Sequence, residues 1–307
     1  MAYFERRGID TRRAEQMDIY NKAYERAQAV LEEERIDPEK FRDYDKDMIA
    51  RDKAYVLKRE AQFKMRATPE SQKTKKIATV FEAIIHEQTE LSDWLGPNAS
   101  TVSTSRYDDI ANGTDTIIRF QREDEADAHL GLAIDVTFSP DIREKLDDVK
   151  EDIKHGKLTE IKYFALPDPE NPDEYASMGR LHVPRVVIGV SNKSVDNLAE
   201  AWIEKEKKIL ARHPIQHVVA REILDQLTIF ERYAISRNKT EIAAVYKQVR
   251  EVLERSLQEK GDGVWLEKRD YRRESEAMGA LRSDNVFIAI TGYMEDIEAM
   301  EIQNMER

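Results

Sequence analysis

Two segments rich in β-branched residues, TDTIIRF at 114–120 and LGLAIDVTF at 130–138, constrain the fold more than any other part of this sequence. Each has the length of a strand, and the residues between them, QREDEADAH at 121–129, are almost entirely polar. We therefore predict an antiparallel hairpin in which the numbers of paired residues sum to 250. In that register one side of the hairpin is nearly all apolar, with Thr116, Ile118 and Phe120 opposite Ile134, Leu132 and Leu130.

The same register places two acids, Asp115 and Asp135, opposite each other on the other side of the hairpin. Like charges that face each other on adjacent strands repel, and they destabilise the sheet unless something neutralises them. Carboxylate oxygens suit a hard cation such as Mg²⁺ or Mn²⁺, which takes one or two carboxylates together with water and phosphate oxygens. The pair is therefore a candidate metal site. The alternative is that Asp135 reaches solvent or pairs with Arg106 or Arg119.

The residues around the hairpin predict the order helix, three strands, helix, strand, followed by one more strand and helix. Apolar residues at spacings of three and four predict the first helix, which Gly96 and Pro97 end. Pro140 and Asp141 open the second helix. The expected segments are a helix over 77–95, strands over 100–105, 114–120 and 130–138, a helix to 156, strands over 158–166 and 183–190, and a helix over 194–212.

Both ends of the chain favour helices. Residues 11–65 are rich in Glu, Lys, Arg and Ala, with an interruption at Asp37 and Pro38, and the polar run SQKTKK at 71–76 is typical of a linker. The predicted fold class is α+β, with a mixed sheet core between helical extensions. The predicted regions are a helical arm over 1–76, an α/β core over 77–212 and a mainly helical C-terminal region over 213–307.

The charge of the chain, −12 in total, is unevenly distributed. Residues 1–76 carry +3, residues 77–192 carry −12 and the remainder carries −3. Nonspecific duplex binders usually show an excess of basic residues. This chain has no such excess overall, although a locally basic surface is compatible with its composition. The absence of cysteine excludes a disulfide scaffold and thiolate metal sites, and no apolar run approaches the roughly 18 residues of a membrane span. We expect a soluble cytoplasmic protein without a membrane partner.

The motif GTD at 113–115, followed by IDVT at 134–137 on the next strand, resembles the PD-(D/E)XK nuclease superfamily, which has the restriction-endonuclease-like fold. The resemblance covers about residues 77–211. It implies that Asp115 and Asp135 hold the divalent metal, Mg²⁺ or Mn²⁺. It also implies that a glutamate on the leading helix assists: Glu82 is the best-placed match, and Glu87 and Glu90 are lesser ones.

The superfamily pattern places a lysine two residues after the second acid, and this chain has Thr137 there. Members of the superfamily relocate this lysine, so the resemblance implies that Lys162 in the following strand substitutes for it, with Lys157 a poorer candidate. A second placement of the motif takes Asp135 as the first acid and Glu160 with Lys162 as the acid-x-lysine element. We disfavour that placement because a helix would separate the two acids.

These observations lead to the hypothesis of a metal-dependent nuclease that hydrolyses phosphodiester bonds of nucleic acid, with Asp115, Asp135, Glu82 and Lys162 as its site. One alternative is a catalytically inactive nuclease-like module that binds protein or nucleic acid. Another is a helical structural protein in which the acid pair is incidental. The missing lysine and the acidic charge favour the inactive module, whereas opposed acids inside apolar strands favour the enzyme. The helical arms are candidate surfaces for a protein partner or for self-association.

Other chemistry-bearing residues have simpler explanations. Asp108 and Asp109 precede a turn at Asn112 and Gly113, and the alternative is that one of the two acids lines the metal site. The segment HEQTE at 86–90 lacks the second histidine of a zinc protease helix, and the histidines at 213 and 217 flank a helix start. No P-loop, dinucleotide fingerprint or nucleophile elbow occurs, so nucleotide-dependent chemistry is unsupported.

Overall fold

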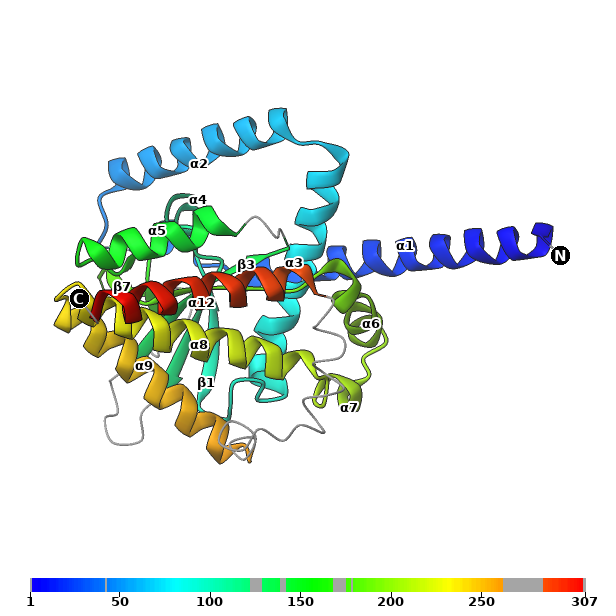
Figure 1. The fold of residues 1–307 in the computed structure, drawn as a ribbon. Helices are drawn as coiled ribbons and strands as arrows, with labels where there is room; N and C mark the ends of the chain where they lie inside the picture. The colour runs from blue at the N-terminus through cyan, green and yellow to red at the C-terminus, as the bar shows by residue number, and fades with distance from the viewer. Residues whose placement is uncertain are drawn as a thin grey trace.

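The computed structural model describes residues 2–41, 43–121, 129–138, 142–167, 175–177, 179–261 and 284–305. Most of the predicted polar loop between the two hairpin strands lies outside the described residues, as do the expected helix-opening residues Pro140 and Asp141. The described part is a mixed α+β structure in which helices surround one small sheet (Figure 1).

The central sheet has four strands in the order β1-β2-β3-β8. The first three run antiparallel to one another, and the last runs parallel to β3. Their bounds are β1 (Ala99–Ser103), β2 (Thr116–Gln121), β3 (His129–Thr137) and β8 (Arg185–Gly189).

The predicted hairpin register is confirmed. Thr116 pairs with Ile134, and Ile118 pairs with Leu132. Alternate side chains along these strands are buried in the main apolar core because side chains of a strand point to opposite faces in turn. A shift of one residue would have moved this apolar set to the other face.

The chain between β3 and β8 contains a helix and two small two-stranded sheets. The helix is α5 (Arg143–Lys154), and the added pairs are β4 (Thr159–Ile161) with β7 (Leu181–Val183) and β5 (Ala165–Pro167) with β6 (Tyr175–Ser177). The predicted strand over 158–166 is therefore broken in two and lies outside the main sheet. A physical reason is that Asp108 accepts hydrogen bonds from the backbone amides of Lys162 and Tyr163, which removes those amides from strand pairing.

Helices cover the sheet and its edge. α3 (Pro69–Leu91) packs against β1 and β3, and α1 (Ala2–Glu33) and α6 (Asn192–Ile203) pack against α3. On the other side of β8 lie α8 (Ile215–Ser236), α9 (Thr240–Glu259) and α12 (Asn285–Met305). The other helices in the described residues are η1 (Pro38–Lys40), α2 (Lys46–Arg66), α4 (Arg106–Asn112) and α7 (Lys207–Leu210). In the described part of the chain no helix is long and apolar enough to cross a membrane.

The predicted linker at 71–76 is wrong, because these residues form the first turns of α3. Thr68 and Ser71 make a capping box: each side chain accepts a hydrogen bond from the backbone amide of the other, at 3.1 and 2.9 Å. Pro69 occupies the first turn, where its missing N–H costs nothing. The polarity of this run reflects exposure to solvent before the apolar face of the helix begins at Ile77, and not a break in the helix.

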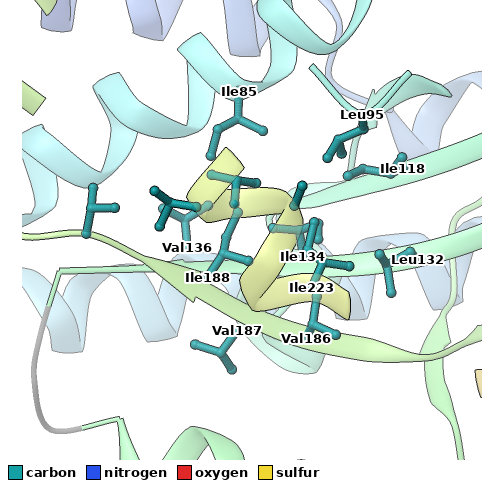
Figure 2. Packing of buried hydrophobic residues seen from close by; sticks show 14 of the residues in the cluster. Ile85, Leu95, Ile118, Leu132, Ile134, Val136, Val186, Val187, Ile188 and Ile223 are labelled. Carbon is teal, nitrogen blue, oxygen red and sulfur yellow. The ribbon is translucent and has the colours of Figure 1, made fainter. Parts of the chain in front are cut away.

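One apolar cluster joins the three predicted regions, since it contains Leu31 of α1, Ile134 of β3 and Leu257 of α9. Figure 2 shows its centre, where side chains of α3, the strands and α8 meet. Val187 of β8 points to the opposite side of the strand from Ile188 (Figure 2). The arm and the C-terminal helices therefore share a core with the sheet.

The edge of the sheet at β8 is closed by α8. Gln226 accepts a hydrogen bond from the Val187 amide at 2.9 Å and donates one to the Val187 carbonyl at 2.6 Å. Glu222 accepts one from the Gly189 amide at 3.0 Å. These side chains satisfy backbone groups that an edge strand would otherwise leave open to pairing with another chain.

Candidate functional site

The two predicted acids lie together at one end of the hairpin. Asp115 directly precedes β2, and its amide donates to the carbonyl of Ile134 at 3.0 Å. Its carboxylate accepts a hydrogen bond from the amide of Val136 at 2.8 Å. Asp115 therefore contacts β3 on both sides of Asp135, which is 6% exposed.

Glu82 of α3 is electrostatically coupled to this pair. Loss of hydration raises the pKa of Glu82 to about 8, and the negative charges of Asp109 and Asp135 add to the effect. The pKa of Asp115 is raised well above its usual range, first by loss of hydration and then by the charges of Glu82 and Asp135. The helix and the two strands thus bring three carboxyl groups close enough to disfavour one another's ionisation.

Asp109 is the acid on α4 whose negative charge raises the pKa values of Glu82 and Asp115. Asp108 instead accepts four hydrogen bonds, from the amides of Lys162 and Tyr163, the hydroxyl of Ser105 and the side-chain amide of Asn112. Asp108 and Asp109 lie in this short helix, and the predicted turn follows at its end, where Gly113 is in the left-handed region at a φ of 62°. The alternative in which one of these acids lines the site is consistent with Asp109.

Two basic side chains approach Asp135. The ammonium group of Lys145, on the first turn of α5, donates a hydrogen bond to its carboxylate. Arg185 of β8 adds a positive charge, although its guanidinium donates to the carbonyl of Asn112 at 3.0 Å. Loss of hydration still outweighs these charges and raises the pKa of Asp135. The ion-pair partner of Asp135 is therefore Lys145, and not Arg106 or Arg119 as the alternative supposed.

Lys162, the predicted catalytic lysine, is engaged elsewhere. Its ammonium nitrogen lies 2.6 Å from the carboxylate of Asp52 on α2 and 4.7 Å from the ring centroid of Tyr107. The hydroxyl of Tyr163 donates to the same Asp52 oxygen at 2.6 Å. This side chain ties α2 to the body of the protein.

The lesser glutamates of α3 have structural partners. Glu87 binds Arg26 of α1 at 2.8 Å and the indole N–H of Trp202 at 2.6 Å. Glu90 accepts a hydrogen bond from the amide of Thr101 at 3.0 Å. Of the three glutamates considered from sequence, Glu82 is the one beside the acid pair.

The lysine beside the acid pair, Lys145, was not predicted from the sequence, because the prediction placed the displaced lysine in the next strand and not in the intervening helix. One sequence feature could have indicated Lys145. It lies only ten residues after Asp135, at the start of the helix that follows β3 and returns across the sheet. The role of Arg185 depends on the parallel pairing of β8 with β3, which no local pattern reveals.

The carboxyl groups suit a hard divalent cation in their chemistry, because such a cation would relieve the repulsion that raises their pKa values. In the ranges that the structure describes, no group of three or more His, Asp or Glu side chains is arranged closely enough to hold a metal ion. A cation at this place would therefore take its protein ligands from the pair Asp115 and Asp135 and complete its shell with water, as Mg²⁺ commonly does.

Comparison with known proteins gives no match: no protein-family model, curated protein or solved structure is detectably similar to this chain.

Without divalent cations, the free energy of unfolding should fall by about 1 kcal/mol or more between pH 7 and pH 8.5. Glu82 has a raised pKa in the folded state, so the folded protein binds more protons than the unfolded chain and loses stability as the pH rises through about 8. Burial lowers the pKa of His213 to about 4, so starting at pH 7 keeps its titration out of the comparison. Urea unfolding in EDTA at the two pH values measures the difference.

Glu82→Gln should flatten this dependence because an amide does not titrate in this range. Glu70→Gln, an exposed substitution on the first turn of the same helix, should leave it unchanged. An equal slope in wild type and Glu82→Gln would show that the carboxyl group of Glu82 is not the source.

Proposed function

We propose that this chain is a metal-dependent, nuclease-like hydrolase of phosphodiester bonds with a core of the PD-(D/E)XK type. The observation that supports the proposal most is the meeting of Asp115, Asp135 and Glu82 with Lys145 at one end of β2 and β3. The elements α3, β1, β2, β3, α5 and β8 also follow the order helix, three strands, helix, strand that the resemblance implies, with β8 in place of the predicted strand over 158–166. The short helix α4 and the strands β4 to β7 lie between these elements.

In this proposal Asp115 and Asp135 hold Mg²⁺ or Mn²⁺, and Glu82 assists them or a bound water. The metal, when bound, supplies a Lewis acid for a phosphate oxygen and lowers the pKa of the attacking water. Glu82 exchanges a proton near pH 8 in the absence of metal, so its carboxyl group is suited to accept a proton from water. The burial of Asp135 limits competition from bulk water for the charges at the site.

Lys145 takes the role that the resemblance assigned to Lys162. Its ammonium group already lies at Asp135, and a phosphate oxygen that approaches the acid pair would come within its reach. A cation held there stabilises the negative charge that develops on the phosphate in the transition state. The ion pair between Lys162 and Asp52 is independent of that chemistry.

Lys145→Ala should lower the turnover number by about 100-fold, because it removes a charge that acts mainly in the transition state. Lys162→Ala should leave turnover of the folded protein within a few fold and instead lower the melting temperature, since it leaves Asp52 without its ammonium partner. Single-turnover cleavage assays with both variants, normalised to folded protein, measure the two effects. The reverse pattern would return the catalytic role to Lys162.

The proposal is tested by incubating the purified protein with plasmid DNA and with single-stranded DNA and RNA in Mg²⁺ or Mn²⁺. Cleavage that requires the metal and stops in EDTA is the expected result. Absence of cleavage on every substrate, together with a melting temperature that ignores millimolar Mn²⁺, would contradict the proposal.

A second candidate function, an inactive nuclease-like binding module, is favoured by one observation. Asp135 already has a cationic partner in Lys145, which partly neutralises the acid pair without a metal. The two candidates differ in their response to Mn²⁺: binding to the folded state alone stabilises it by about 1.4 kcal/mol at a tenfold excess over Kd. Asp115→Asn should abolish that response, and in metal-free buffer it should be at least as stable as wild type because it removes a repelled charge.

A further inference from the structure

The most basic stretch of the described chain lies in α2 and the start of α3. Residues 46–76 contain ten Lys or Arg side chains and four Asp or Glu side chains, a net charge of +6. Because the whole chain carries −12, the other residues together carry −18. In Figure 1 α2 runs along one side of the molecule and then turns sharply into α3, and it packs against α4.

Two of the four acidic side chains in this stretch are turned toward the protein. Asp52 binds the ammonium group of Lys162 at 2.6 Å, and Glu60 binds the guanidinium of Arg106 at 2.7 Å. Ile49 and Val56 are buried on the same side of α2. The acids thus dock the helix onto the body and are neutralised there.

Most of the basic side chains of this stretch are exposed to solvent. Eight of them are exposed and form no ion pair with any residue that the structure describes: Lys46, Arg51, Lys58, Lys64, Arg66, Lys73, Lys75 and Lys76. We call the exposed surface of α2 and of the first turns of α3 that carries these side chains the basic arm face. The side chains lie on more than one side of α2, and the surface is positively charged and open to a partner of opposite charge.

This face stands beside the candidate site. Arg106 of α4 binds Glu60 of α2 with one guanidinium nitrogen and Asp109 with another, at 2.7 and 2.6 Å. Asp109 belongs to the carboxyl group cluster of Glu82 and Asp115. One arginine side chain therefore separates the helix that carries the basic arm face from the acids.

We infer that the basic arm face binds the phosphate backbone of a nucleic acid and holds it next to the candidate site. The inference rests on the proposed function, which identifies the partner as a nucleic acid. Charge complementarity indicates where on the protein that partner binds. A site surrounded by negative charge needs a local source of positive charge to attract a polyanion, and lysine and arginine side chains on an exposed helix supply it.

An anionic membrane is a less suitable partner. A helix that lies in a membrane interface presents one continuous apolar face. The exposed apolar side chains of α2 are Tyr55, Leu57, Phe63 and Met65, and at 3.6 residues per turn they lie on different sides of the helix. Vesicle binding is therefore the outcome that would replace the inference.

The test compares Lys58→Glu/Lys64→Glu with Lys207→Glu/Lys208→Glu, which reverses two exposed lysines of α7, away from α2 in Figure 1. Both double variants change the net charge equally. Fluorescence anisotropy with labelled single-stranded DNA, duplex DNA and RNA in EDTA measures binding without cleavage, and the three probes identify the preferred form.

We expect the α2 variant to bind at least about tenfold more weakly and with a smaller dependence on salt, and the α7 variant to bind like wild type. Equal weakening in both variants, or no binding by wild type at low salt, would overturn the inference. A third result would also overturn the inference. In it, no nucleic acid binds, wild type binds vesicles containing phosphatidylserine, and of the two variants only the α2 variant loses vesicle binding.

The proposed function and this inference can fail separately. A protein that binds nucleic acid through α2 but never cleaves it would refute the first and leave the second. A protein that cleaves while Lys58→Glu/Lys64→Glu binds and cleaves like wild type would refute the second and leave the first.

Discussion

Asp135→Asn should lower the rate of metal-dependent cleavage by at least about 1000-fold while leaving the fold intact. The amide has the shape of the carboxylate, so the pairing of β3 with β2 and β8 is retained. It lacks the negative charge that a divalent cation requires, and it frees Lys145 from its ion pair. Single-turnover cleavage in Mn²⁺, together with far-ultraviolet circular dichroism, measures the two properties.

Asp148→Asn provides a matched control, because it removes the same charge from an exposed position on α5. It should cleave at the rate of wild type. Cleavage by Asp135→Asn at more than a tenth of the wild-type rate would remove Asp135 from the site and with it the proposed role of the acid pair.

The largest effect on stability is expected from Asp108→Ala, which should cost about 3 to 5 kcal/mol. The fully buried carboxylate accepts two backbone hydrogen bonds, from Lys162 at 2.7 Å and Tyr163 at 3.1 Å, besides those from Ser105 and Asn112. Alanine would leave these buried donors without an acceptor, and each unsatisfied group costs about 1 to 3 kcal/mol. Urea unfolding gives the free energy directly.

The neighbouring acid is the control for this prediction. Asp109 is half-buried and its ion pair with Arg106 is partly exposed, so Asp109→Ala should cost no more than about 1 kcal/mol. Similar losses in the two variants would mean that α4 as a whole, and not the hydrogen bonds of Asp108, is responsible for the stability.

The register of the central hairpin could be predicted from the sequence because it depends on a pattern of period two. The apolar positions of 114–120 and 130–138 allow one pairing that buries a complete face, and Asp115 and Asp135 follow from that pairing. Helices with continuous apolar stripes, such as α3 from Ile77 onward, were predictable for the same local reason.

The segments that sequence analysis misplaced are those whose structure depends on distant partners. The polarity of the run at 71–76 predicts a linker, yet the capping box of Thr68 and Ser71 begins a helix there. The strand over 158–166 was interrupted because Asp108, 54 residues away from Lys162 in the chain, takes the amides that a strand would use.

The α+β class, the hairpin and the opposition of its two acids could be predicted from local sequence patterns, because strand alternation and helical periodicity are local properties. The side chains that join the two acids could not be predicted in this way, because they come from distant elements that the packing brings together. Lys145 reaches Asp135 because α5 returns across the sheet, and Lys162 reaches Asp52, 110 residues away, because α2 docks beside α4. Such contacts depend on how helices pack on a common core, and a sequence pattern of a few residues carries no information about that packing.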